Sequence, residues 1–414
     1  MTSPVAERRA AMTVEGIRAQ FPALARQHNG HAVAYFDGPG GTQVPRVVTD
    51  AITDYLLHHN ANTNWVYPTS VETDRMVAQS RIVMADFVNG APNEIVFGMN
   101  MTTLTFHLAR ALGRGWQAGD EVVITELDHH ANQAPWRAIE QEKGITIRVV
   151  RMDPASGQLE WGDLESAVTK KTKLLAIGAA SNALGTINDV AAAAALARSV
   201  GALTFVDAVH YAPHNLVDVQ AMGCDFLACS AYKFYGPHIG ILWGRKSRLQ
   251  RLDVPKLDPA PNTVPERLET GTLSHEAMVG SAAAVEFMAG IGDGPTRRER
   301  LQHAFEVMHE RQQALVERMW IGLSSIRGVS TFGPIPSEPR TSTVSFTVDG
   351  RSTNEVALGL AERGVFVSNG DFYASTVIQR LGFDADGLVR AGAACYTSAD
   401  EVDRLIAAVV EVSS

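Results

Sequence analysis

From about residue 93 the chain alternates short apolar runs, rich in β-branched residues, with stretches of helical period. Seven of these runs are candidate strands: EIVFG, EVVIT, ITIRVV, KLLAIG, LTFVDA, DFLACS and ILWG. Apolar strands separated by helices are typical of a parallel sheet covered on both faces, with right-handed crossovers. The pattern therefore predicts an α/β domain with a mainly parallel seven-stranded sheet. Ligand chemistry should lie at the carboxyl ends of its strands.

The pattern changes after about residue 290. A long charged helix leads to the strand TSTVSFTV, a further helix, the strand VRAGAAC and a final helix, which is an α+β arrangement. At 414 residues and 45% hydrophobic content, the chain can form more than one core. We therefore expect a large domain over residues 36–288 and a smaller α+β C-terminal domain over residues 289–414. Residues 1–35 should form an N-terminal segment that packs with the small domain.

Composition narrows the kind of partner. A formal net charge of -9 and the absence of a Lys/Arg run argue against a nucleic-acid or membrane partner and favour small molecules. The N-terminal stretch has no apolar core of signal-peptide length, and no run of about 18 apolar residues occurs, so we expect a cytoplasmic protein. Cys224, Cys229 and Cys395 are too few and too irregularly spaced for a disulfide framework or a zinc site. We expect buried thiols and no metal.

One acid and one lysine stand out against this apolar background. Lys233 follows DFLACS in a stretch otherwise built like core strand, and Asp207 ends the strand LTFVDA 26 positions earlier. A desolvated amine with a lowered pKa is what imine chemistry with a carbonyl cofactor requires, and a buried carboxylate can keep a pyridine nitrogen protonated. The alternatives are a lysine that snorkels to solvent and an aspartate that caps a helix. Together the two residues suggest pyridoxal phosphate, with Lys233 as the Schiff-base lysine.

Other strand ends carry candidate cofactor contacts. His129 and His130 follow EVVIT, and one of them should face the pocket to stack on a planar ring or move protons. Metal binding by this pair is disfavoured because no Cys or carboxylate lies at ligand spacing. Thr102 and Thr103 begin a helix, where they could bind phosphate or simply cap the helix. Asn182 could donate to the phenolic oxygen of the cofactor or form a turn.

These motifs together resemble the class V aminotransferase family of fold-type I pyridoxal-phosphate enzymes, most closely the group II cysteine desulfurases, over roughly residues 30–412. The resemblance implies that Lys233 binds the cofactor covalently, that Asp207 pairs with the pyridinium nitrogen and that His129 stacks on the ring. It implies further cofactor contacts by Thr103, Asn182, His210, Ser230 and Tyr232. His210 stands where desulfurases usually have a glutamine near the phenolic oxygen, and Tyr232 where they have a histidine near the phosphate.

The resemblance also extends to the substrate and to a second subunit. Arg390 in LVRAGAACYT matches the arginine that grips the substrate α-carboxylate, a task that suits a guanidinium fork. The motif ETGTLSH resembles a loop that reaches the partner's phosphate across a dimer interface, which nominates Thr272 and implies a homodimer.

The loop VSNGDFYAS departs from the family. Desulfurases have an arginine at the position of Ser368 and a nucleophilic cysteine aligned with Tyr373 or close to it, and this chain has neither. No thiolate of this loop can therefore collect sulfur as a persulfide, which disfavours the usual desulfurase mechanism. Phe372 and Tyr373 could line the pocket, supply a phenol for proton transfer, or pack as an aromatic pair under the loop.

Two N-terminal segments are candidates for substrate recognition. Gly40 and Gly41 in FDGPGGTQVP would let backbone approach the substrate carboxylate closely. Asn64, Trp65 and Tyr67 in NANTNWVYP are possible readers of its side chain.

The leading hypothesis is a pyridoxal-phosphate enzyme that binds an L-amino acid through Arg390 and removes its α-proton with Lys233. A C–S β-lyase acting on an S-substituted cysteine comes first, because it needs no enzyme cysteine. An aminotransferase follows, and then a decarboxylase or epimerase, since all begin from the same bound state. An alternative of another class is a catalytically silent, cofactor-binding accessory protein.

Overall fold

The structure is a computed structural model and describes residues 12–414. Its large domain is built on a seven-stranded sheet in the order β4-β12-β11-β10-β9-β5-β6. Neighbouring strands are parallel except at β12, which runs antiparallel to both β11 and β4. The strands are β4 (Ile95–Gly98), β5 (Glu121–Thr125), β6 (Thr146–Val150), β9 (Thr172–Gly178), β10 (Leu203–Asp207), β11 (Phe226–Ser230) and β12 (Gly240–Gly244). The expected mainly parallel α/β sheet is confirmed.

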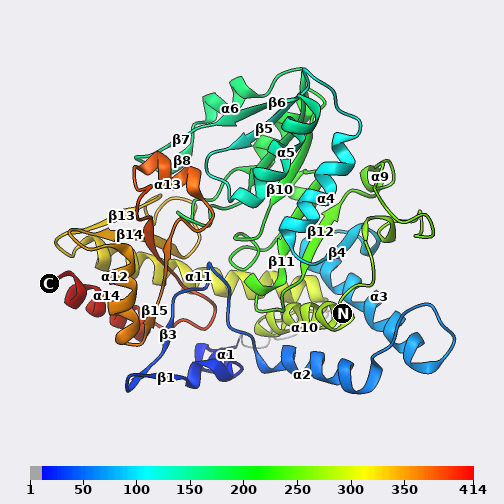
Figure 1. The fold of residues 1–414 in the computed structure, drawn as a ribbon. Coiled ribbons are helices and arrows are strands. Elements are labelled where there is room, and N and C mark those ends of the chain that lie inside the picture. Colours follow the sequence, from blue (N-terminus) through cyan, green and yellow to red (C-terminus); the bar gives the residue numbers. More distant parts are fainter. Residues whose placement is uncertain (1–11) are drawn as a thin grey trace, which may run out of the picture.

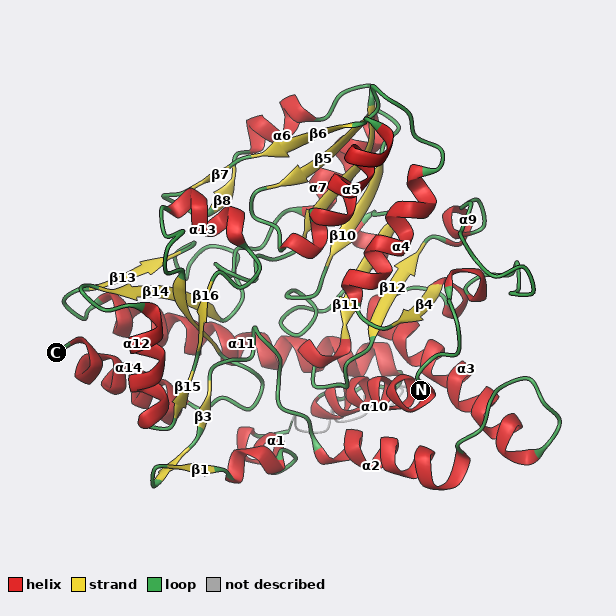
Figure 2. Ribbon diagram, viewed as in Figure 1, coloured by secondary structure: helices red, strands yellow, loops and turns green. Residues whose placement is uncertain are grey.

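Helices cover both faces of this sheet (Figures 1 and 2). Successive residues of a strand point to opposite faces, so Val123 belongs to one apolar core while Val122 and Ile124 belong to the other. The first core includes α3 (Pro68–Val88), α7 (Val190–Ser199) and α10 (His275–Ile291), and the second includes α4 (Met101–Gly113) and α5 (Ala134–Lys143). Burial on both faces explains why the central strands are mostly apolar, whereas the edge strand β6 is partly exposed and contains Arg148.

The small domain has a four-stranded antiparallel sheet in the order β13-β14-β17-β16. Its elements are α11 (Arg297–Ser324), β13 (Val329–Phe332), β14 (Thr343–Val348), α12 (Thr353–Glu362), β15 (Val365–Phe366), β16 (Ser368–Gly370), α13 (Ser375–Leu381), β17 (Leu388–Gly392) and α14 (Ala399–Ser413). The sequence pattern indicated β14, α12, β17 and α14 but not the short elements β13, β15, β16 and α13.

The long helix α11 joins the two domains, as its course in Figure 1 shows. Leu301 and Phe305, in its first half, pack in the large-domain core, whereas Val316 and Met319 pack in the small-domain core. The helix is therefore shared between the domains and does not belong to the small domain alone.

The N-terminal segment contacts both domains. β3 (Ala34–Tyr35) pairs in parallel with β15, and Arg18 forms a 2.8 Å ion pair with Glu401 of α14. Phe21, by contrast, packs in the large-domain core. The part of the expected segment at residues 1–11 lies outside the described residues.

The remaining elements are short or peripheral. They are α1 (Val14–Arg18), β1 (Gln27–His28), β2 (His31–Ala32), α2 (Arg46–Asp54), β7 (Met152–Asp153), β8 (Gln158–Leu159), α6 (Trp161–Ala167), α8 (Val219–Met222) and α9 (Lys246–Leu249), the π-helix Tyr55–His59, and the 3-10 turns Pro22–Ala25, Pro92–Glu94, His130–Asn132, Ala231–Lys233 and Glu266–Leu268. No helix within residues 12–414 is both long and apolar enough to cross a membrane.

Candidate active site

A cavity of about 740 Å³ lies at the carboxyl ends of the central strands, where the small domain meets the large one. The strand ends of β5, β9, β10 and β11 supply much of its lining, as expected for an open α/β sheet. The amino end of α4 closes one side, and the small domain contributes Phe372, Tyr373 and Arg390. Among the described residues, no group of three or more His, Cys, Asp or Glu side chains could hold a metal ion.

Lys233 lies in this cavity, in the 3-10 turn that follows β11. Its Nζ donates hydrogen bonds to the carbonyl oxygens of Pro39 and Gly40, at 3.0 Å for Gly40. Burial and the positive charge of Arg390 lower the pKa of Lys233 to about 7, while Asp207 opposes the shift. The side chain is thus an amine that can lose its proton near neutral pH.

Asp207, the last residue of β10, lies buried in the same cavity. One carboxylate oxygen accepts a hydrogen bond from the Val209 backbone N–H at 2.9 Å. Burial raises the pKa of Asp207 to about 6, and the Val209 N–H and Lys233 limit the rise. Asp207 does not cap the next helix, because Asp218 caps α8. The acid is left facing the cavity.

Asp128 is a second buried carboxyl in the cavity, and the sequence interpretation missed it. Its carboxyl accepts hydrogen bonds from the Thr125 hydroxyl at 2.8 Å and the Asn132 amide at 3.2 Å. Burial raises its pKa to about 7, with a contribution from the charge of Asp207. A Cβ at Gly178 would lie 2.5 Å from its Oδ1, so the neighbouring strand needs glycine there. The feature of the sequence that could have indicated Asp128 is its position directly before the histidine pair.

Of the two histidines, His129 lines the cavity and His130 does not. The Nδ1 atom of His129 accepts the Ala131 N–H at 2.9 Å, so a neutral ring carries its hydrogen on Nε2. Burial, reinforced by Lys233, lowers the pKa of His129 to about 4, so the ring is neutral at pH 7. The Nε2 atom of His130 instead lies 3.0 Å from the Ser375 hydroxyl oxygen.

The loop at residues 370–375 places two aromatic rings in the cavity. Phe372 and Tyr373 have φ angles of 56° and 55°, in the left-handed region that side chains rarely adopt. Their carbonyl oxygens accept hydrogen bonds from the Asn182 side chain at 2.9 Å and from the His130 N–H at 2.8 Å. Large-domain donors thus hold the loop in this conformation.

Arg390, on β17, is buried behind this loop. Its guanidinium carbon lies 4.1 Å from the centre of the Phe372 ring, and Nη1 donates to the Asn182 carbonyl at 2.7 Å. Burial lowers the pKa of Arg390 to about 9, and Asp37 opposes the shift. The arginine remains charged at pH 7 and can bind an anionic group entering the cavity.

Thr102 and Thr103, at the amino end of α4, have different hydrogen-bonding environments. Thr103 forms a capping box with Asn100, donating its N–H at 2.9 Å to the Asn100 side chain and its hydroxyl at 3.0 Å to the Asn100 carbonyl. Capping therefore uses Thr103, and Thr102 is the better candidate for phosphate. Near this helix end, the Ser230 hydroxyl oxygen accepts a hydrogen bond from the Met101 N–H at 3.0 Å.

Two further rings line the cavity near this helix end. Tyr232 stacks on His238 with ring centres 4.8 Å apart and an interplanar angle of 13°. The sequence interpretation nominated Tyr232 but not His238, whose setting in GPHIG resembles an ordinary turn.

Several nominated residues lie outside the cavity lining of this chain. Gly41 packs against Tyr232, while the preceding Gly40 lines the cavity. Asn64 and Tyr67 lie on an exposed loop, and exposed Thr272 precedes α10. The cavity lining of the described chain does not include Asn64, Tyr67 or Thr272.

The three cysteines are free and buried, as expected. Burial raises the pKa of Cys224 and of Cys395 to about 12, and that of Cys229 also rises. None of them lines the cavity. No cysteine side chain of this chain is therefore poised as a nucleophile there.

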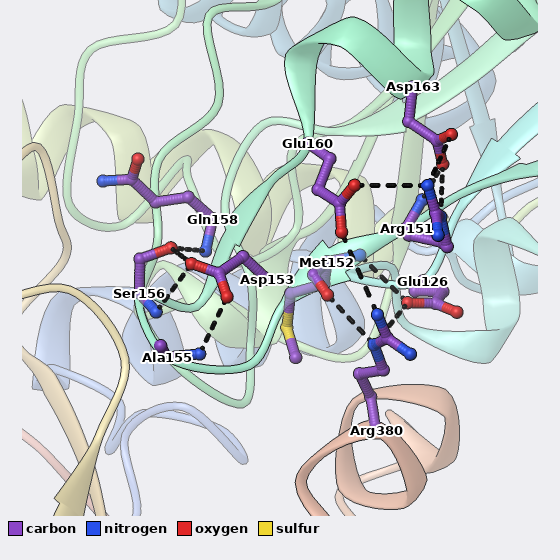
Figure 3. A network of polar contacts seen from close by, with 10 residues as sticks. All are labelled: Glu126, Arg151, Met152, Asp153, Ala155, Ser156, Gln158, Glu160, Asp163 and Arg380. Carbon is purple, nitrogen blue, oxygen red and sulfur yellow. Dashed lines mark hydrogen bonds and ion pairs between the residues drawn. The ribbon is translucent and has the colours of Figure 1, made fainter.

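A polar network anchors α13, which directly follows the aromatic loop (Figure 3). Arg380 donates through Nε to the Met152 carbonyl at 3.1 Å and lies 3.6 Å from a Glu126 carboxylate oxygen and 3.9 Å from one of Glu160. Beside it, apolar side chains of both domains form one buried cluster: Leu127, Met152, Ala183, Leu184, Ala374, Val377, Ile378 and Leu388. Arg380 is thus well placed to help hold the loop over the cavity.

The residues present fit pyridoxal phosphate. Asn182 Oδ1, His210 Nδ1 and Arg390 Nε are buried polar atoms of cavity residues without a hydrogen-bond partner among residues 12–414. Buried polar atoms are normally paired, so these atoms indicate a polar ligand. An amine of lowered pKa, a buried acid and a helix amino end match the cofactor's carbonyl, ring nitrogen and phosphate.

Such a fold, with a low-pKa lysine and a buried aspartate at the strand ends, defines a fold-type I pyridoxal-phosphate enzyme. The sequence profile of the aminotransferase class-V family matches residues 34–405, so the chain belongs to this family of pyridoxal-phosphate-dependent enzymes. It is 30% identical to a cysteine desulfurase of Serratia proteamaculans, over 96% of this chain and 98% of that protein. A probable cysteine desulfurase of Xylella fastidiosa is 31% identical, over 96% and 95% of the two chains.

Solved structures agree with this assignment. The apo structure of a cysteine desulfurase from Thermococcus onnurineus superposes with a TM-score of 0.88 at 28% identity, over 98% of this chain and 99% of that one. A cysteine desulfurase from Escherichia coli gives a TM-score of 0.84 at 25% identity, over 97% and 98% of the two chains.

Proposed function

We propose that this enzyme is a C–S β-lyase that cleaves an S-substituted L-cysteine into a thiol, pyruvate and ammonia, with one water consumed. One observation carries the proposal. The loop over the cavity presents Phe372 and Tyr373, while all three thiols are buried away from it. A β-elimination takes its leaving sulfur from the substrate and needs no enzyme thiol. The relatives' names, which are those of cysteine desulfurases, support a cysteine-derived substrate.

The chain's own residues can hold the cofactor. Lys233 would bind its carbonyl carbon, Asp207 would keep a proton on its ring nitrogen, and His129 would lie against its ring face. Thr102 and the amino end of α4 would bind its phosphate. When bound, pyridoxal phosphate supplies an electron sink for the bond broken at the substrate's α-carbon.

The substrate is then oriented by charge. Arg390 would bind the α-carboxylate with its fork of N–H groups, held in place by the Asn182 carbonyl and the Phe372 ring. Lys233, neutral above a pKa of about 7, would take the α-proton. Tyr373, which lines the cavity and has 71% of its surface exposed, would give a proton to the departing sulfur.

The proposal is tested by incubating the holoenzyme with S-methyl and S-benzyl cysteine, and separately with plain amino acids plus a keto acid. Thiol and pyruvate released in equal amounts are the expected result. Pyridoxamine phosphate formed without thiol would contradict the lyase and favour an aminotransferase, while carbon dioxide release or racemisation would indicate a decarboxylase or epimerase. Lys233→Ala serves as the control and should abolish every one of these products.

We also infer that the enzyme works as a homodimer. Thr272, Asn64 and Tyr67 are exposed, and Trp65 and Val66, which lie between Asn64 and Tyr67 in the chain, expose 53% and 98% of their surface. Exposed apolar side chains of this kind favour a covered interface. Light scattering should give twice the chain mass, and Thr272→Ala should weaken cofactor binding without changing that mass. A monomer at working concentration would contradict the inference.

The cytoplasmic location stays a prediction.

A further inference from the structure

His210 is a buried histidine with only one of its ring nitrogens in use. It is 3% exposed and lines the cavity beside Asp207. Its Nε2 lies 3.1 Å from the Thr341 hydroxyl and 3.1 Å from the Thr343 hydroxyl. Its Nδ1 is buried and has no partner among the described residues. The unpaired nitrogen therefore belongs to a side chain that faces the ligand space.

The two threonines decide which nitrogen carries the hydrogen. Both are nearly fully buried, and a buried hydroxyl hydrogen without an acceptor is unfavourable because it has lost its hydrogen bond to water. Within residues 12–414, the only atom within hydrogen-bonding distance of either hydroxyl is His210 Nε2, and the tautomer decides which atom donates. If Nε2 carried a hydrogen, neither hydroxyl could donate to it. A bare Nε2 has one lone pair, which the two hydroxyls can share, and a neutral imidazole then carries its hydrogen on Nδ1.

The ring is also neutral. Burial, the adjacent His214 and the cations Arg390 and Lys233 keep the pKa of His210 well below its ordinary value. The His214 ring lies edge-on with its centre 5.1 Å away. These neighbours disfavour a doubly protonated imidazole, in which both nitrogens would donate.

We propose that Thr341 and Thr343 are positioning residues that hold His210 as the Nδ1–H tautomer, so that it presents a fixed hydrogen-bond donor to an oxygen of the bound cofactor. His210 follows β10 of the large domain, whereas Thr343 begins β14 and Thr341 precedes it. The donor is therefore set by packing between the domains. The inference depends on the pyridoxal-phosphate site but not on the lyase reaction.

The test removes the hydroxyls and keeps the shape. In the holoenzyme, the double variant Thr341→Val/Thr343→Val should raise the apparent pKa of the cofactor's visible absorbance by about one unit. The Kd for the cofactor should rise about tenfold, the effect of losing a hydrogen bond to a charged oxygen. Thr341→Ser/Thr343→Ser keeps the hydroxyls and should restore both values. Thr347→Val, on the same strand, should change neither.

Making the same two substitutions in a His210→Gln variant distinguishes a positioning role of the threonines from a general structural effect of the substitutions. His210→Gln supplies an amide donor whose hydrogen needs no threonine to fix it. In that background the two valine substitutions should leave the absorbance pKa unchanged. A shift as large as in the His210 background would overturn the proposal.

The tautomer can also be observed directly. Two-dimensional ¹⁵N–¹H spectra of the full chain with labelled histidine, assigned with His210→Gln, should show Nδ1 protonated and Nε2 bare. The double valine variant should lose that preference. Protonation at Nε2 in the unaltered chain would refute the inference whatever the activity assays show.

Discussion

The phenol ring of Tyr373 stacks on the imidazole of His129, with ring centres 5.7 Å apart and an interplanar angle of 28°. The contact joins the small-domain loop to the strand end that carries the cavity histidine. It brings a hydroxyl group to the cavity at the place where desulfurases are expected to carry a cysteine. In the proposed elimination, Tyr373 can act through its hydroxyl group, as a proton donor, or through its ring, by packing alone.

Tyr373→Phe keeps the stacking ring and removes the hydroxyl. If the phenol protonates the leaving sulfur, kcat should fall about a hundredfold while KM stays within about twofold, the size typical of a lost general acid. The loss should shrink for S-aryl cysteines, whose thiolates leave without help. Full activity in Tyr373→Phe, together with reduced activity in Tyr373→Ala, would show that the ring acts by packing alone.

Arg380 should act on the reaction through the position of the loop. Arg380→Gln is expected to lower kcat/KM about tenfold, mainly through KM, and to speed amide exchange over residues 370–376. Its ion pairs are long and partly exposed, so the change in unfolding free energy should stay within about 1 kcal/mol. Arg318→Gln, which breaks a surface pair with Asp403, is the matched control. Equal effects of both variants would contradict a positioning role.

The sequence was sufficient for part of this site. Asp207 ends one buried strand and Lys233 follows the neighbouring one, and the ends of neighbouring parallel strands meet at one edge of a sheet. The sequence did not single out Asp128, because an acid directly before two histidines is equally typical of a polar turn. The left-handed backbone of Phe372 and Tyr373 could not be predicted, since such residues rarely adopt it. The contact of His210 with Thr341 spans 131 positions and depends on domain packing, which no local pattern indicates.

Cofactor association should report the state of Lys233. Only the neutral amine attacks a carbonyl, so the rate of covalent capture should rise with pH up to about 7 and level off above it. At pH 6 the rate should be about tenfold below its plateau. Stopped-flow absorbance of the cofactor-free protein measures it, with Lys233→Ala as the variant that lacks the covalent phase. A rate that still climbs beyond pH 9 would indicate a lysine of ordinary pKa.

Asp128 should make the folded state sensitive to pH. Its pKa rises from an ordinary 3.8 to about 7 on folding, so the unfolded chain loses this proton first as pH increases. Stability therefore declines between these two values, and the full cost of a buried charge is present above pH 7. Asp128→Asn has no charge, and its side chain can pair with both Thr125 and Asn132. We expect it to raise the unfolding free energy by about 1–3 kcal/mol at pH 8 and to leave it nearly unchanged at pH 4. Urea unfolding at both values measures this, and an equal change at the two pH values would show that the substitution alters packing instead of charge.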